Sequence, residues 1–203
     1  MVYNIIMENI QKIENIIIDN IFSQEQINYI YDVIKNTPED RGVVQTRLGH
    51  RAWLATFNED LRLHLEKLVQ DRFGSDWYLN EFQFARYSNE YGYLPKLYPH
   101  FDDMFASHKL TLDVQIKANT EWPLVVEGKS FTLNDNQGLI FSGTDKIHWR
   151  EEKTLKDGEY LDMFFCHLQK DEPISQEWKD MMQAREKEWL DKIGISRDEI
   201  KIG

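Results

Sequence analysis

The stretch from Trp77 to Leu168 constrains the fold of this chain more than any other, because it is a series of short strand-like segments separated by turns. From Tyr78 to Tyr87 the residues follow the period of two that a half-buried strand shows. The turn signals that follow predict further strands over 109–116, 124–126, 130–133, 138–141, 146–152 and 160–168. Many short strands at close spacing are typical of a barrel or a sandwich.

Helical signals flank this series on both sides. Ser23 and Gln26 form a capping box at the start of one helix, which the later Asn-Thr-Pro triplet ends. A second helix is predicted from about Asn58 to Gly74, since glycine is a common helix stop. Apolar residues recur at helical spacing over 175–193, so a third helix is predicted after the strands.

The chain shows no internal repeat, no low-complexity segment and no linker long enough to separate two domains. We therefore expect a single domain over residues 1–203, mainly β with flanking helices. Residues 1–75 supply supporting helices and an N-terminal apolar run, 16–22, which is a short strand or an apolar lead-in. Residues 76–168 form the strand core, and 175–194 form a C-terminal helix.

Composition and charge narrow the function classes. The 203 residues are 41% hydrophobic and 13% aromatic, enough to bury a core, and the net charge of -11 argues against a protein that binds nucleic acid. The single cysteine, Cys166, cannot form an internal disulfide and lies in an apolar run, which favours a buried thiol and a reducing compartment. Polar residues interrupt the isoleucine-rich N-terminus, which offers neither a signal-peptide core nor a membrane span. We expect a soluble, cytoplasmic protein.

Three residues have the chemistry of a metal site. His100 and Asp102 stand two residues apart, and His148 follows after four or so predicted strands. Two imidazoles and one carboxylate are the facial triad that binds non-haem Fe(II) and leaves the opposite face open. In an extended strand, residues i and i+2 share a face, so Asp102 can reach the metal while Asp103 points away. A His-x-Asp triplet also arises by chance, and a lone histidine on a strand is often a core residue.

The surroundings of the triplet make the pattern more specific. Tyr87 precedes a glycine-bearing loop, Tyr98 and Pro99 precede the first histidine, and residues 138–141 precede the second. This order resembles the Fe(II)/2-oxoglutarate-dependent oxygenases, in their prolyl 4-hydroxylase-like branch, over roughly residues 76–168. The resemblance implies a double-stranded β-helix (a cupin-like jelly roll) with helices on one side. It also implies that the protein uses Fe(II), 2-oxoglutarate and O2.

Enzymes of this family decarboxylate 2-oxoglutarate to succinate and CO2, and they usually hydroxylate a C–H bond. Carried over position by position, His100, Asp102 and His148 match the iron ligands. Tyr87 matches a tyrosine that hydrogen-bonds the cosubstrate, and Tyr98 matches one that faces the active site. The carboxylate at Asp102 disfavours a halogenase, which would need that position vacated for chloride.

The basic residue that anchors 2-oxoglutarate has no clean match. The family usually places it about ten residues after the distal histidine, where this chain has Lys156-Asp157-Gly158. Strand parity offers Arg150 instead, because it shares a face with His148 and its planar guanidinium suits a carboxylate. Lys109 is the second candidate. Arg150 could also form a surface pair with one of the two glutamates that follow it.

Other residues carry weaker signals. Four further histidines have no ligand-like partner at short spacing and are interpreted as surface or core residues: His50, His64, His108 and His167. Of these, His167 could face inward. Five side chains could line a substrate pocket, although packing or solvated surface is the commoner role: Arg51, Arg86, Met104, Phe105 and Trp122.

Three functions are therefore compared. The leading hypothesis is an Fe(II)- and 2-oxoglutarate-dependent dioxygenase acting on a small molecule or a protein side chain. The second is a cupin-like metal-binding protein that does not use 2-oxoglutarate. The third is a non-catalytic β-sandwich interaction domain in which the three metal-site candidates are unrelated.

Overall fold

The computed structural model describes residues 13–45, 48–92, 94–102, 107–173, 175–194 and 196. Its helices and strands are, in chain order, β1 Ile16–Asp19, α2 Gln24–Asn36, the 3-10 helix η1 Glu39–Arg41, β2 Gly42–Gln45, β3 His50–Trp53, α3 Glu59–Phe73, β4 Tyr78–Ser88, β5 Leu97–His100, β6 Ser107–Ala118, β7 Leu124–Val126, β8 Lys129–Phe131, β9 Gln137–Ser142, β10 His148–Arg150, β11 Tyr160–Pro173 and α4 Gln176–Ile193.

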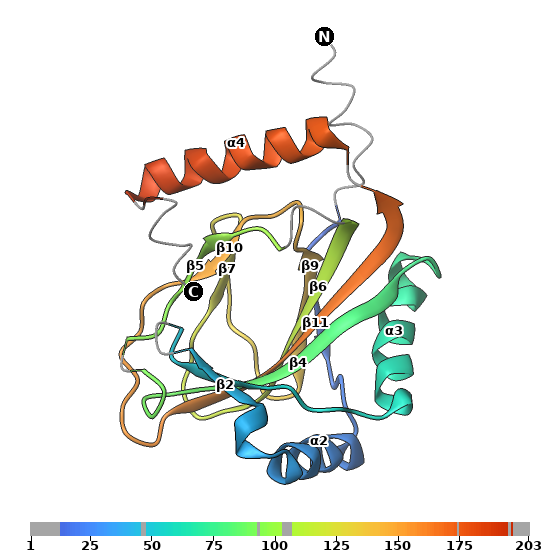
Figure 1. Ribbon diagram of the computed structural model, residues 1–203, viewed down its shortest axis with the longest axis vertical. Helices are drawn as coiled ribbons and strands as arrows, with labels where there is room; N and C mark the ends of the chain where they lie inside the picture. Colours follow the sequence, from blue (N-terminus) through green and yellow to red (C-terminus); the bar gives the residue numbers. More distant parts are fainter. Residues whose placement is uncertain are drawn as a thin grey trace.

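The strands form two antiparallel sheets. The larger sheet has the order β1-β9-β6-β11-β4-β3-β2, and the smaller one has the order β5-β10-β7-β8. From β4 to β11 the chain passes repeatedly from one sheet to the other, so strands distant in sequence become neighbours, such as β6 beside β11 and β5 beside β10 (Figure 1). This topology is a double-stranded β-helix, or jelly roll, with β1 added at one edge of the larger sheet and β2 and β3 at the other. The predicted fold class is confirmed.

The predicted helix signals are confirmed at the atomic level. The Ser23 side chain accepts a hydrogen bond from the Gln26 N–H, and the Gln26 side chain accepts one from the Ser23 N–H, which is a complete capping box. Asn58 caps α3 by accepting from the Leu61 N–H. Gly194 ends α4 in the left-handed conformation, which glycine adopts without strain.

The helices cover both sheets. α2 and α3 pack on the larger sheet, where Ile30, Leu65 and Val69 are buried in one core with residues of β6 and β11. α4 instead covers the smaller sheet, where its Trp178 packs with Trp149 in a second cluster (Figure 1). Helices therefore lie on two sides of the barrel, rather than on one side as predicted. None of the described helices is both long and apolar enough to cross a lipid bilayer.

The strand β6 has two different faces. Its apolar side chains pack into the core beneath α2 and α3: Leu110, Leu112, Val114 and Ile116. The alternate side chains point between the two sheets and are polar, yet all are buried: Lys109, Thr111, Asp113 and Gln115. Because buried polar groups need partners, this row indicates that the barrel interior has a role beyond packing.

Some strand limits differ from the prediction. β2 and β3 lie in a stretch for which the sequence predicts no strand, and each has four residues at the edge of the larger sheet. β10 is shorter than the predicted 146–152, and β5 already begins at Leu97. β11 continues to Pro173, because its backbone pairs with β6 along its length, and this pairing does not depend on the side chains of β11. Backbone pairing, which has no side-chain period, sets these limits.

Cys166 lies on the helix-facing side of β11. Its side chain is buried and free, and burial raises the pKa of the thiol well above its ordinary value. The predicted burial of the thiol is therefore confirmed, and its raised pKa favours the unreactive protonated form.

Candidate metal centre

The three candidate metal ligands converge at one end of the barrel interior. His100 ends β5, His148 begins β10, and the two residues lie directly opposite each other in the antiparallel pairing, with ring centroids 4.2 Å apart. Asp102 Oδ1 lies 3.3 Å from His148 Nε2 and 3.6 Å from His100 Nε2. One donor atom of each residue lies within 4.8 Å of the others, a spacing suited to a single ion. We call this region the metal end.

Asp102 reaches the site by a different route from the predicted one. β5 ends at His100, so Asp102 is not part of an extended strand and lies in a bend. Its N–H donates a hydrogen bond to the Gly143 carbonyl oxygen at 2.9 Å, which fixes the bend. A Cβ on Gly143 would overlap the Asp102 carboxylate and the Thr111 hydroxyl, so this close approach requires glycine. Asp103 lies outside the described residues.

Backbone carbonyl groups orient both histidine rings. His100 Nδ1 lies 2.8 Å from the Tyr98 oxygen, and His148 Nδ1 lies 3.0 Å from the Lys146 oxygen. A carbonyl oxygen only accepts, so each Nδ1 carries the hydrogen and each Nε2 faces the other ligands. Both rings are thus held in the tautomer that a metal at Nε2 needs.

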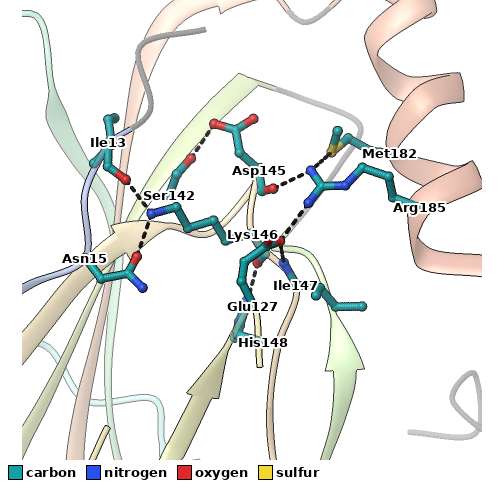
Figure 2. Close-up of polar contacts among 10 residues, drawn as sticks. All are labelled: Ile13, Asn15, Glu127, Ser142, Asp145, Lys146, Ile147, His148, Met182 and Arg185. Carbon is teal, nitrogen blue, oxygen red and sulfur yellow. Dashed lines mark hydrogen bonds and ion pairs between the residues drawn. The ribbon is translucent and has the colours of Figure 1, made fainter. Parts of the chain in front are cut away.

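The loop before His148 is fastened to the N-terminal part of the chain. The Lys146 ammonium group donates to the Asn15 side chain at 2.6 Å and to the Ile13 carbonyl oxygen (Figure 2). The Lys146 carbonyl oxygen is the group that orients His148. A single residue therefore connects β1's leading segment to the imidazole.

The terminal helix α4 holds the same loop from the other side. Arg185 donates to the Asp145 carbonyl oxygen at 2.9 Å and to the Glu127 carboxylate at 2.7 Å (Figure 2). Glu127 accepts in turn from the Ile147 N–H at 3.2 Å. The guanidinium also lies over the Phe101 ring, 5.6 Å from its centroid. Phe101 is the residue between His100 and Asp102 in the sequence. α4 thus supports the geometry of the site as well as covering the smaller sheet.

The electrostatics favour an ionised Asp102. Burial raises the pKa of this carboxyl, but the His148 charge and the hydrogen bonds of both histidines outweigh burial and hold it well below its ordinary value. The pKa of His148 is lowered by burial, and Asp102 more than reverses this effect. The metal-free site therefore favours a carboxylate anion beside the charged form of His148, and an ion at Nε2 would take the place of that proton.

Sequence reasoning missed two side chains at the metal end. The Thr111 hydroxyl donates a hydrogen bond to Asp102 Oδ2, and His167 Nε2 lies 3.7 Å from the same oxygen. The sequence could have indicated Thr111, because it lies two residues after Lys109 and therefore on the same face of a strand whose other face is apolar. His167 was expected as a surface or core residue that could face inward, and it does face inward.

Arg150 lies deeper in the barrel, in a region we call the inner end. It is 3% exposed, and its guanidinium donates to the Trp122 carbonyl oxygen and lies over the Trp122 ring at 5.3 Å. Its Nη2 is 4.0 Å from the sulfur of Met163 on the opposite sheet. Its Nε is buried and has no hydrogen-bond partner within the described residues. The predicted inward face is confirmed, and the alternative surface pair is wrong.

Tyr87 and Asp113 share the inner end with Arg150. Burial raises the pKa of Tyr87 to about 12, although the Arg150 charge opposes this shift. Burial also raises the pKa of Asp113, and again the Arg150 charge opposes it. The Tyr87 ring packs edge-on against Trp122 and His50, each with centroids 5.0 Å apart. Aromatic rings therefore pack on two sides of Tyr87 at this end.

The two candidate anchors occupy different places. Lys109 is buried near the metal end, where its charge acts on Glu81 and His167. Arg150 acts on Tyr87 and Asp113 at the inner end. The two candidates thus act on different groups of the barrel interior.

The structure places several other predicted residues away from the site. Arg86 forms a bidentate pair with Asp162 at 2.6 and 2.7 Å, and Arg51 lies over the Trp53 ring. Tyr98 contributes its carbonyl oxygen, while its ring lies 4.6 Å from the Lys96 ammonium group. For three residues named from the sequence, the residue or its side chain lies outside the described part of the structure: Met104, Phe105 and His108.

Neither a protein-family model nor a curated protein sequence matches this chain. Solved structures do. HygX from Streptomyces hygroscopicus, with nickel, 2-oxoglutarate and hygromycin B bound, has a TM-score of 0.57 at 10% identity, covering 81% of this chain and 86% of its own.

Two proteins of nogalamycin biosynthesis are also similar. The epimerase SnoN, in complex with Fe3+, alpha ketoglutarate and nogalamycin RO, has a TM-score of 0.61 at 10% identity, covering 83% of this chain and 84% of its own. The alpha ketoglutarate dependent carbocyclase SnoK has a TM-score of 0.61 at 8% identity, covering 83% of this chain and 91% of its own. At these identities the similarity is one of fold, and this chain has the jelly-roll fold that HygX, SnoN and SnoK share.

Proposed function

We propose that this protein is an Fe(II)- and 2-oxoglutarate-dependent dioxygenase that hydroxylates a C–H bond of a small molecule and releases succinate and CO2. One observation carries the proposal. The barrel interior holds a His-Asp-His cluster at one end and, deeper, a buried arginine whose Nε is without a partner in the described part of the chain. A metal site alone, or an interaction sandwich, has no need of such an arginine.

His100, Asp102 and His148 would hold the iron. Two imidazole Nε2 atoms and one carboxylate oxygen match the ligand preference of non-haem Fe(II) and occupy one face of the ion. When bound, Fe(II) supplies the oxygen activation that is coupled to decarboxylation of 2-oxoglutarate. The protein's part is to keep the three donors in place, which the two backbone-oriented rings and the Asp102 bend do.

Arg150 would bind the far carboxylate of 2-oxoglutarate. Its Nη1 is already fixed by the Trp122 carbonyl oxygen, so the guanidinium is oriented before a ligand arrives, and Nε is left to donate. Tyr87 would donate its hydroxyl hydrogen to the same ligand, since its raised pKa keeps it protonated. Lys109, nearer the metal end, and Tyr98 remain secondary candidates for contacts with cosubstrate.

A small-molecule substrate is the class we favour. HygX binds hygromycin B and SnoN binds nogalamycin RO, and both are small molecules. The prolyl 4-hydroxylase-like branch is supported by the order of Tyr87, Tyr98, Pro99 and the three ligands in the sequence. SnoN is an epimerase and SnoK a carbocyclase, so C–H oxidation has more than one outcome on this fold; hydroxylation is the outcome we propose here.

The test is an anaerobic titration. Protein with Fe(II) and 2-oxoglutarate should develop a weak visible absorption band, and admission of air should release succinate. Asp102→Ala should abolish both, whereas Asp135→Ala, which removes an exposed carboxylate that accepts from the Ala118 N–H, should abolish neither.

The two alternatives predict other results. A cupin-like protein would be stabilised by metal but would give no band with 2-oxoglutarate. An interaction domain would show no rise in melting temperature with Fe(II), Mn(II) or Ni(II), because a ligand of the native state must stabilise it.

A further inference from the structure

The two oxygens of the Asp102 carboxylate have different surroundings. Oδ1 faces the Nε2 atoms of His148 and His100, at 3.3 and 3.6 Å. Oδ2 faces the larger sheet, where the Thr111 hydroxyl donates to it and His167 Nε2 lies 3.7 Å away. An ion bound by the cluster would therefore use Oδ1, and Oδ2 is left to the protein.

His167 is itself held in place by a second carboxylate. Its Nδ1 lies 3.5 Å from Glu81 Oε2, so its two ring nitrogens face two different acceptors. Strand register explains the arrangement: His167 on β11 lies directly opposite Glu81 on β4 and directly opposite Thr111 on β6. Side chains directly opposite in a sheet project from the same face, so three neighbouring strands place one polar row behind Asp102.

We propose that His167, held by Glu81, is a positioning residue for the metal-binding carboxylate. It fixes Oδ2 so that Oδ1 stays aimed between His100 and His148. This inference rests on the ligand set proposed above and extends it to residues outside that set. Groups that hydrogen-bond or orient a ligating carboxylate commonly change metal affinity about 10- to 100-fold when removed.

Two other roles for His167 fit the geometry less well. His167 does not belong to the group of described donors that lie within 4.8 Å of one another, so it is placed behind a ligand rather than among the ligands. An ordinary surface histidine would not have both ring nitrogens within 3.7 Å of carboxylate oxygens. The side chain of His167 is 26% exposed and that of Glu81 is 61% exposed, so the Glu81 contact is the more weakened by solvent.

The test uses Mn(II) as the probe and the electron paramagnetic resonance signal of the free ion as the readout, without turnover. His167→Leu should weaken Mn(II) binding about 10- to 100-fold, and His167→Gln, whose amide can donate to Oδ2, should recover part of the loss. Glu81→Gln should weaken binding a few-fold at most, because its side chain is exposed. Since Glu81 contributes little to the core, this variant also tests the pair if His167→Leu does not fold.

The control separates positioning from folding. His64→Gln alters a histidine whose Nε2 contacts the Ile21 carbonyl oxygen at 2.7 Å in the helical layer. It should lower the melting temperature of the metal-free protein and leave Mn(II) affinity unchanged. The His167 variants should instead weaken Mn(II) binding and leave the melting temperature of the metal-free protein unchanged.

Each outcome bears on a different part of the proposal. Wild-type affinity in His167→Leu and in Glu81→Gln would refute the positioning role and leave the ligand set standing. Complete loss of Mn(II) in His167→Leu with no recovery in His167→Gln, as in Asp102→Ala, would make His167 a ligand and also refute it. Absence of Mn(II) binding by the wild-type protein would overturn the ligand set itself.

Discussion

The two ends of the barrel interior differ in how fully the protein satisfies their polar groups. At the metal end, carbonyl oxygens orient both histidine rings and Thr111 donates to Asp102. At the inner end, Arg150 donates to one carbonyl oxygen, and its buried Nε lacks an acceptor among the described residues. The metal end is preorganised, whereas the inner end is short of an acceptor that a ligand carboxylate would bring.

Each end contains a buried carboxyl group, and the two have opposite pKa shifts. Burial is the largest influence on both and raises both pKa values. At Asp102 the His148 charge and two hydrogen bonds outweigh burial, whereas at Asp113 the Arg150 charge does not. The charge of His148, together with the two hydrogen bonds, thus gives the two buried carboxyl groups pKa shifts of opposite direction. The raised pKa of Asp113 favours its uncharged form, which competes less than an anion would for the charge of Arg150.

The largest expected effect separates the two ends by mutation. Arg150→Leu should weaken 2-oxoglutarate binding to the Mn(II)-loaded protein about 100-fold, because a buried charge pair loses its cation. Arg150→Lys should lose about 10-fold, since an ammonium group cannot bind a carboxylate through two parallel donors. Titration calorimetry measures both. Mn(II) affinity should not change, and a larger loss in Lys109→Leu than in Arg150→Leu would move the anchor to Lys109.

The second effect is a pH dependence that belongs to the inner end. Burial lowers the pKa of His50 to about 4 from an ordinary value of 6.5. The unfolded chain therefore binds the proton first, and stability falls as pH drops from about 6.5 to about 4, by about 3 kcal/mol. Urea unfolding of the metal-free protein at several pH values measures this loss, which His50→Phe should remove.

Asp102 at the metal end titrates in a different window. Its pKa is lowered in the folded state, so its contribution is present above the ordinary value near 4 and is lost only as pH falls further. A His50→Phe protein that still loses the same stability between pH 6.5 and 4 would contradict the assignment to the inner end.

The third effect breaks the preorganisation of the metal end. Gly143→Ala places a methyl group against Asp102 and Thr111, so it should weaken Mn(II) binding about 10- to 100-fold by displacing the carboxylate. Gly158→Ala is the matched control, because no atom lies within 4 Å of its added Cβ. It should cost stability through its positive φ of 79° and leave Mn(II) affinity as it is.

The smallest expected effect tests the charge of Asp113. Asp113→Asn keeps the shape of a carboxyl whose pKa is raised by burial and removes only its ability to ionise, so 2-oxoglutarate affinity at pH 7 should stay within about threefold of wild type, by the same calorimetric titration. Binding that becomes more than about tenfold tighter would mean that Asp113 is an anion competing for Arg150.

Local signals in the sequence predicted the helix ends and two of the residues that the fold brings together. The Ser23 capping box and Gly194 mark real helix ends, since caps depend on a few neighbouring residues. His100 and His148 were paired from chemistry alone, and the strand register places them opposite each other. Parity also placed Arg150 on the inner face.

The missed features depend on contacts between distant strands. The bend at Asp102 needs the Gly143 carbonyl oxygen, and the row of Glu81, His167 and Thr111 exists only in the register of three strands. The residues next to each of these positions in the sequence do not specify which distant residue it will contact. A slip of one residue would turn the row to the opposite face, so register carries this information and local pattern does not.

The pairing of His100 with His148 has a mechanical consequence. An ion bound by both would act as a cross-link that closes the segment between them, which contains β6, β7, β8 and β9. Closing a long loop removes conformational freedom from the unfolded chain for as long as the ion stays bound. Metal would then slow the separation of β5 from β10.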